Sequence, residues 1–365
     1  MATPLPPYVP RTRRAIRHLL QLHPAPWRWK VGVEAGLALG LPLGLFTAVG
    51  QQGWGLQAAL GAFTALYGAS LSRRDRAHLL PLVALALVVA AALGVACADN
   101  PWLSAGGLLV VSGVAASVAL GFRVGPPGPM FLVLVTAVSG HLTRAPELGG
   151  VGLPGGPLIG LVAAGAVLAY LVTMAPLLLP SVRRHARPTG LRVLFPHFQL
   201  DAEAKLLVLR VVVGVLATSA LAWALGVHRP YWVVLSAVAV LQASPSRQLT
   251  AIRGVQRMVG TLLGIGVFEL LTITQPTGLG LVVVLMLLQF ATEVVVARNY
   301  ALALLFITPL ALLNATAAHP ENSWAAVQDR ILDTLLGSST ALMVLWLSEV
   351  LRSTQPPSSP DTLEH

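Results

Sequence analysis

The chain has 365 residues, of which 55% are hydrophobic and only 10% are charged, and its mean hydropathy is +0.75. Soluble domains carry roughly 25% charged residues, so this composition excludes a soluble protein and indicates an integral membrane protein. The formal net charge of +10 would suggest nucleic-acid binding in a soluble chain, but here the basic residues fall between apolar segments. The expected surrounding is the lipid bilayer, and no nucleic-acid partner is expected.

The apolar segments begin after a basic arm, residues 1–30, which lacks the pattern of a cleavable signal peptide. A membrane helix needs about 20 residues, and no segment shows the strict alternation of barrel strands. The sequence therefore predicts an all-α integral membrane fold with about twelve transmembrane helices. They are 31–49, 54–71, 79–98, 102–121, 129–143, 157–180, 205–226, 231–244, 254–274, 277–296, 299–318 and 325–351.

Two polar segments complete the chain. Residues 181–204 are broken by proline and rich in arginine, which predicts a cytoplasmic linker on anionic lipid headgroups. Residues 352–365 predict a disordered tail, whose final Leu-Glu-His resembles the remnant of an expression tag. Most Lys and Arg residues lie in alternate loops together with the N-terminal arm and this linker. Because cytoplasmic loops carry the excess of basic residues, both termini are predicted to be cytoplasmic.

The chain reads as two halves, 31–180 and 205–351, each with six segments at a nearly constant offset in sequence. Trp54 and Trp232 both open a second segment, and basic residues follow that segment in both halves. Since six is even, the halves would share one orientation and be related by an axis along the membrane normal. Two parallel six-helix repeats are predicted, with a transport path between them.

The motifs of common enzyme classes are missing from the sequence. Lys30 and Lys205 are the only lysines, and neither lies in a phosphate-binding loop of the GxxxxGK[ST] type. Cys97 is the single cysteine, and neither HExxH nor GxSxG occurs. We therefore expect no enzymatic activity, no bound metal and no cofactor.

Several ionisable residues fall at membrane depth, where a charge is costly and usually faces a bundle interior or an aqueous path. Glu269, Glu293 and Asp333 are the candidates for proton coupling. Glu34 and Glu349 lie near segment ends, from which they could instead reach headgroups. Arg330 and Asp333 are three residues apart on one predicted helix, so mutual neutralisation is an alternative for that pair.

Three arginines, at positions 247, 253 and 257, precede a glycine-rich apolar segment. Arg253 and Arg257 are four apart and share a helix face, where like charges repel unless an anion or carboxylate separates them. Arginine can bind a carboxylate through two parallel hydrogen bonds. Gly260 and Gly264 form a GxxxG pair that favours a close helix neighbour. The competing interpretation is that these arginines only anchor a helix end at the cytoplasmic surface.

Three stretches resemble the fusaric acid resistance protein-like family. They are PYWVVLSAVAVLQASPSRQLTAIRGVQRMVGTLLG (230–264), NYALALLFITPLALLNA (299–315) and RILDTLLGS (330–338). The family includes bacterial exporters of aromatic carboxylic acids, and the plant aluminium-activated malate channels look related. The resemblance is weak in the first half, where the arginine and Gly-Thr signature is absent.

This resemblance implies a transporter in the bacterial cytoplasmic membrane that exports small organic anions, aromatic or other carboxylic acids. Arg253 and Arg257 would gather the anion, Arg247 and Arg298 would add positive potential, and Asn299 and Tyr300 would donate hydrogen bonds. The aromatic residues Tyr231, Trp232 and Trp54 are either interfacial belt residues or rings that stack on the substrate. A passive anion channel and a non-transporting scaffold subunit are the alternatives, and a homo-oligomer or accessory export proteins are compatible with each.

Overall fold

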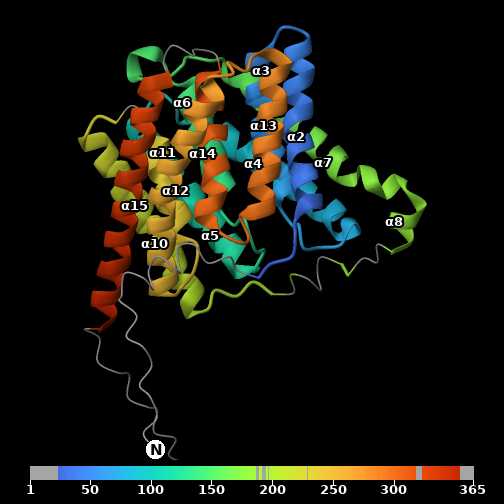
Figure 1. The fold of residues 1–365 in the computed structure, drawn as a ribbon. Helices are drawn as coiled ribbons and strands as arrows, with labels where there is room; N and C mark the ends of the chain where they lie inside the picture. The colour runs from blue at the N-terminus through green and yellow to red at the C-terminus, as the bar shows by residue number, and fades with distance from the viewer. Residues whose placement is uncertain are drawn as a thin grey trace, which may run out of the picture.

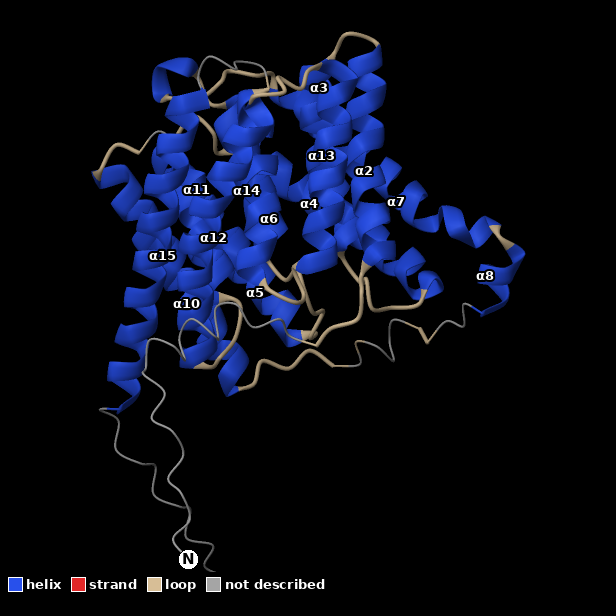
Figure 2. Cartoon of the chain, in the orientation of Figure 1, coloured by secondary structure: helices blue, strands red, loops and turns tan. Residues whose placement is uncertain are grey.

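The computed structural model describes residues 24–185, 189–190, 195, 197–227, 229–317 and 323–353, and the regular elements in these ranges are all helical (Figure 2). Eight of the described helices are long and apolar enough to cross a membrane. This confirms an all-α, multi-pass membrane protein. The eight are α2 (Trp29–Ala48), α4 (Arg73–Ala96), α5 (Pro101–Gly121), α7 (Gly155–Met174), α10 (Ala202–Ala224), α12 (Arg247–Thr272), α13 (Gly278–Val295) and α15 (Ser323–Ser353).

The other predicted segments fall on shorter helices. The second segment becomes α3 (Gln52–Ala58) and the 3-10 helix η1 (Ala59–Leu66), and the remaining three become α6 (Met130–Thr143), α11 (Pro230–Leu241) and α14 (Tyr300–Thr316). A helix needs about 20 residues to cross the hydrocarbon, so twelve full crossings stay a prediction. The small elements η2 (Pro146–Leu148), η3 (Ala175–Leu178) and α8 (Pro180–His185) lie between the larger ones.

Local sequence explains where several helices begin. Ser72, Asn100, Asp201 and Asn299 are N-cap residues whose side chains accept backbone N–H groups at the starts of α4, α5, α10 and α14. Such caps satisfy donors that the first helical turn leaves unpaired. Proline at the first position of α5 and α11 fits the same rule, since it has no N–H to satisfy.

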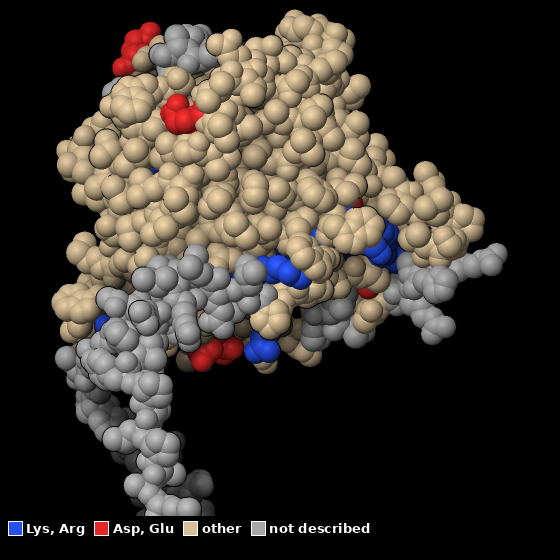
Figure 3. Space-filling view, in the orientation of Figure 1, with Lys and Arg blue, Asp and Glu red and all other residues tan. Residues whose placement is uncertain are grey.

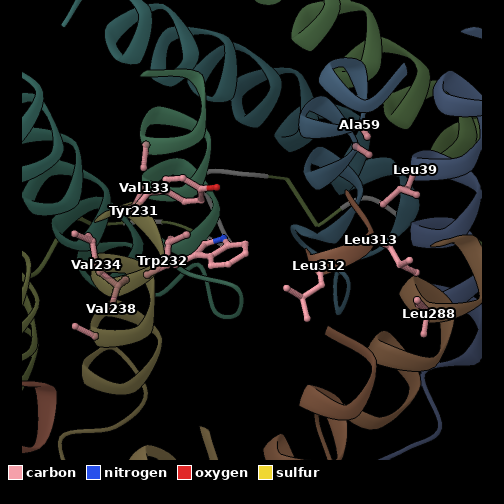
Figure 4. Close-up of a cluster of buried hydrophobic side chains, with 14 of the residues drawn as sticks. Leu39, Ala59, Val133, Tyr231, Trp232, Val234, Val238, Leu288, Leu312 and Leu313 are labelled. Carbon is pink, nitrogen blue, oxygen red and sulfur yellow. The ribbon is translucent and has the colours of Figure 1, made fainter. Parts of the chain in front are cut away.

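The two halves of the chain pack into one bundle. Helix α2 lies beside α13 of the second half (Figure 1), and α10 of the second half packs against α5. One cluster of buried apolar residues includes Leu39 and Ala59 from the first half with Trp232 and Leu312 from the second. The Trp232 side chain points from α11 toward the side of the cluster that holds Leu312 (Figure 4). The halves therefore share a hydrophobic core and do not form separate domains.

The surface has the charge distribution of a membrane protein. On the face in Figure 3 the broad middle is almost free of Lys, Arg, Asp and Glu, and Lys and Arg appear along the lower edge. Many large apolar side chains of the membrane-length helices are exposed, among them Leu85, Val110 and Leu287. Apolar exposure over such an area fits contact with lipid, because an aqueous surface rarely carries it.

Cysteine labelling tests the predicted orientation. With Cys97 replaced by serine, an impermeant maleimide added from outside is expected to label cysteines placed at 50–53 and to leave those at 189–190 unlabelled. The physical reason is the excess of basic residues on the linker side. The predicted outer loop 319–322 lies outside the described residues and can be labelled in the same way. External labelling of the linker would reverse the topology.

Candidate functional site

The arginines of α12 lie on its first three turns, after the N-cap Ser246. Arg247 is exposed at the helix start, whereas Arg257 is 2% exposed. Close packing of α12 on α14 buries this part of the helix, because Gly264 leaves no room for a side chain against the backbone of Leu304. The GxxxG pair therefore has the expected effect of bringing a neighbouring helix close.

That neighbour supplies Tyr300, which lies between two arginines. The Nη1 atom of Arg257 donates a hydrogen bond to the Tyr300 hydroxyl at 2.6 Å, and the Arg253 guanidinium lies 3.9 Å from the centre of the same ring. The Nε atom of Arg253 also donates to the Ala239 carbonyl at 2.9 Å, in the last turn of α11. The aromatic face and the helix-end carbonyl both favour a cation, which partly offsets the burial of Arg253.

Neither arginine has an acidic partner. Within the parts of the chain that the structure describes, no carboxylate lies within 4.0 Å of Arg253 or Arg257, and the Nε atom of Arg257 is buried without a hydrogen-bond acceptor. Burying a cation without a counter-ion is costly, and two like charges one turn apart repel. The arrangement is therefore one that an anion would stabilise.

A third buried arginine, Arg330 of α15, extends this cluster. It is 4% exposed, and its guanidinium lies 4.9 Å from the ring centre of Trp232. Arg229 lies 5.2 Å from the same ring and pairs with Asp329 at 3.6 Å. We call Arg253, Arg257 and Arg330, together with Tyr300, the arginine cluster. The four residues come from α12, α14 and α15.

The sequence-based alternative for Arg330 was mutual neutralisation with Asp333, and in this structure the two residues interact electrostatically but are not directly paired. The two side chains form no ion pair within 4.0 Å, and both carboxylate oxygens of Asp333 lack a hydrogen bond among the described residues. Spacing on one helix cannot predict this outcome, because Arg330 lies against Trp232 on a different helix. Two sequence signals pointed to these residues: their spacing at membrane depth and the family-like stretch RILDTLLGS, which contains both.

Two basic residues of the first half, Arg73 and Arg76, share one carboxylate partner. Glu34 of α2, which is 7% exposed, accepts Nη2 of Arg73 at 2.5 Å and Nη1 of Arg76 at 2.7 Å. Arg76 also donates to the Ala65 carbonyl, and Arg73 to the Thr173 carbonyl. The alternative that Glu34 reaches the headgroups is therefore wrong. This cluster is internally paired, in contrast to the arginine cluster of the second half.

A buried arginine outside these clusters, Arg210, is also paired. It lies on α10, is 1% exposed and donates to Glu349 at 2.5 Å, to Ser348 at 3.0 Å and to the Pro245 carbonyl at 3.2 Å. Glu349 is the residue that could also have reached the headgroups. Here it joins the last turns of α15 to α10.

The other residues predicted to bind the substrate lie outside the arginine cluster. Arg298 stacks on Trp27 and bonds the Ala25 carbonyl, and Asn299 accepts the Leu302 N–H as the N-cap of α14. Tyr231 is buried beside Trp232, whereas Trp54 is 50% exposed.

Three carboxylates are predicted for proton coupling, and the surroundings of Glu269 and Glu293 differ from those of Asp333. Glu269 is exposed on α12, and Glu293 of α13 is buried with Arg28 at 3.7 Å. Asp333 alone combines burial with two oxygens that lack a hydrogen bond among the described residues.

Comparison with known proteins agrees with the sequence resemblance. Residues 216–344 match a family described as fusaric acid resistance protein-like, which confirms the resemblance for this part of the chain. The uncharacterized membrane protein YvaC of Bacillus subtilis is 29% identical over 132 residues, 36% of this chain and 21% of that protein. An uncharacterized protein of Haemophilus influenzae is 33% identical over 168 residues, 43% of this chain and 23% of that protein. The chain thus matches less than a quarter of either relative. No solved structure matches.

Proposed function

We propose that this protein is a membrane transporter that exports small organic anions, with aromatic and other monocarboxylates as its substrate class. The observation that carries the proposal is the buried arginine cluster, in which Arg253 and Arg257 flank Tyr300 without a carboxylate partner among the described residues. The matched family segment, 216–344, contains the whole cluster. An organic anion would supply the missing negative charge.

The chemistry of the cluster suits a carboxylate with an aromatic group. Guanidinium groups can hold a carboxylate through two parallel hydrogen bonds and keep their charge when buried. The Tyr300 hydroxyl already accepts from Arg257, so its own proton is available for donation. Trp232 offers an aromatic ring next to Arg330 for stacking on an aromatic acid. Tyr231 continues this aromatic surface toward α6, where its ring lies 5.0 Å from His141.

Helix packing supports the predicted architecture of two parallel six-helix repeats. In the first half α4 packs against α6, and α7 against α3 and η1; the corresponding pairs in the second half, α12 with α14 and α15 with α11, also pack together. The close crossings also correspond. A side chain at Gly165 would meet the Ala58 carbonyl, and one at Gly337 would meet the Val233 carbonyl. In a two-repeat transporter the substrate path lies near the repeat interface, which here would follow α11 beside α6.

The two halves would have different tasks in this proposal. Glu34 already pairs with both Arg73 and Arg76, so in the first half a carboxylate of the protein occupies the place between the basic side chains. The arginine cluster of the second half keeps its positive charge and would hold the substrate. Only one anion would therefore bind per chain.

An exchange of Arg257 for glutamine tests the proposal in proteoliposomes loaded with benzoate. We expect Arg257→Gln to weaken benzoate binding about 30-fold, because loss of one charged hydrogen bond costs about 2 kcal/mol. Its thermal unfolding without benzoate should not shift downward, since the change removes an unpaired buried cation. Arg123→Gln is the control: Arg123 is an exposed arginine, which pairs with Asp201 at 3.4 Å, and its removal should leave transport unchanged.

Benzoate flux and current separate the transporter from its alternatives. A wild-type protein that moves no benzoate or acetate would support the scaffold interpretation. A non-saturating current would indicate the passive channel. Wild-type affinity in Arg257→Gln would return this residue to the role of a helix anchor.

A further inference from the structure

The carboxyl group of Asp333 has an unusual environment in the middle of α15. Its side chain is 1% exposed, and both oxygens are buried without a hydrogen bond among the described residues. An ionised carboxylate in this position would be a buried charge with neither a hydrogen bond nor a direct ion pair, which is strongly unfavourable. The arrangement in the structure is therefore compatible with a protonated Asp333, which carries no charge.

The nearest cation on the same helix points elsewhere. Arg330 lies one turn before Asp333, and its guanidinium is stacked on Trp232 while its Nε atom lacks an acceptor. Side chains three positions apart on a helix have Cβ atoms about 5 to 6 Å from each other. A change of rotamer could thus bring the long Arg330 side chain to the Asp333 carboxylate, away from the arginine cluster.

Charged and titratable groups face this part of α15 from several helices. Arg229 is engaged with Asp329 at 3.6 Å, so these two largely neutralise each other. On α10, Arg210 is bound to Glu349 near the other end of α15. The groups that remain next to Arg330 and Asp333 are Tyr231 of α11, Arg257 of α12 and Tyr300 of α14. Among the described residues, Arg229 and Arg330 are the cations whose charge acts on Asp333, and of these two only Arg330 belongs to the arginine cluster.

We propose that Asp333 is a proton-binding site linked to the anion site. It holds a proton while Arg330 faces an anion in the arginine cluster, and it releases that proton when the anion leaves and Arg330 turns to the carboxylate. The inference rests on the proposed function, because it requires that the cluster bind an anion. It adds a ligand, the proton, and a residue, Arg330, that selects between the two states.

The exchange conserves charge and protons. On release, the contact between Arg330 and the anion is replaced by a contact between Arg330 and the Asp333 carboxylate. The carboxylic acid O–H bond breaks, and its proton passes to water that enters the vacated anion site. One negative charge and one positive charge leave together, so the buried site keeps the same net charge in both states. Constant charge avoids the large cost of an unpaired ion in the bilayer.

The linkage has a definite sign. Protonation of Asp333 leaves Arg330 available to the anion, so anion affinity is highest at low pH. As the pH rises through the titration of Asp333, the ionised carboxylate competes for Arg330 and affinity falls, by up to about tenfold per pH unit for one coupled proton. By reciprocity, anion binding draws a proton onto the protein.

Benzenesulfonate is the suitable probe, because it stays ionised across the whole pH range and any pH dependence must come from the protein. Its dissociation constant is to be measured on the full chain in detergent between pH 5 and pH 9, with proton uptake followed by a pH indicator in weak buffer. We expect wild-type affinity to fall with rising pH, with up to one proton taken up per anion. Asp333→Asn should bind with the wild-type low-pH affinity at every pH and take up no proton.

Two further variants keep the test sharp. Glu203→Gln is the control, because Glu203 is an exposed carboxylate in the first turn of α10, and it should keep the wild-type pH dependence. Arg330→Gln should bind more weakly and without pH dependence, which provides a second measurement if Asp333→Asn does not fold. Binding that is independent of pH in the wild type, or dependent on pH in Asp333→Asn, would overturn the linkage and leave the anion site intact. Absence of benzenesulfonate binding by the wild type at every pH would overturn both proposals.

Discussion

Glu34→Gln is expected to lower the free energy of unfolding by about 3 to 5 kcal/mol, the usual effect of removing one partner from a buried ion pair. The Glu34 carboxylate holds both Arg73 and Arg76, and the side chain of Arg76 is only 4% exposed. Glutamine keeps the size of the side chain but removes its charge. Arg76 would then be a buried cation whose remaining partner is the Ala65 carbonyl.

Unfolding of the Glu34 variant can be followed by titration with denaturing detergent. Glu269→Gln is the matched control, since Glu269 is an exposed glutamate on a membrane helix and its exchange should change stability little. The double variant Glu34→Gln, Arg76→Met should recover part of the loss, because both charged partners are then removed. Equal stability of Glu34→Gln and the wild type would mean that the first-half cluster is not held by this carboxylate. Recovery of Glu34→Gln by added benzoate would show that the unpaired cluster can bind an anion.

Gly165→Val is expected to destabilise the fold by about 3 kcal/mol, at the upper end of the usual cost of overpacking. A Cβ atom at Gly165 would overlap the Ala58 carbonyl, with the Ala58 carbonyl carbon at 2.8 Å. Gly61 on the opposite segment faces the backbone of α7 in the same way, so the two elements cross with direct backbone contact. Backbone atoms cannot turn aside as a flexible side chain can, and α7 would have to move away from the end of α3 and from η1.

The control for this crossing lies on the same helix. Gly160 has no atom within 4 Å of the Cβ position, so Gly160→Val makes the same change in helix propensity without the clash. The difference in thermal midpoint between the two variants measures the cost of the clash at the helix crossing alone. A Gly165→Val protein as stable as Gly160→Val would show that α7 and η1 can separate at little cost.

The arginine cluster could be predicted from the sequence only in part. The spacing on one helix face indicates Arg253 and Arg257, the family resemblance adds Tyr300, and the structure brings these three together. Arg330 was missed as a member of the cluster. Its spacing to Asp333 suggested a local ion pair, but its guanidinium lies against Trp232, which is almost a hundred residues earlier in the chain. Helix spacing carries no information about such a neighbour.

The sequence by itself determined that this protein lies in a lipid bilayer, that it is helical and where its helical segments lie. Apolar runs of this length must leave water, and in a bilayer a helix satisfies its own backbone hydrogen bonds, so composition and spacing suffice. Only the tertiary structure decided which buried charges are neutralised. Glu34 pairs with Arg73 and Arg76. By contrast, Arg253, Arg257 and Arg330 have no carboxylate partner among the described residues. The physical reason is that an ion pair acts over a few ångströms, and helices distant in sequence set those distances when they pack.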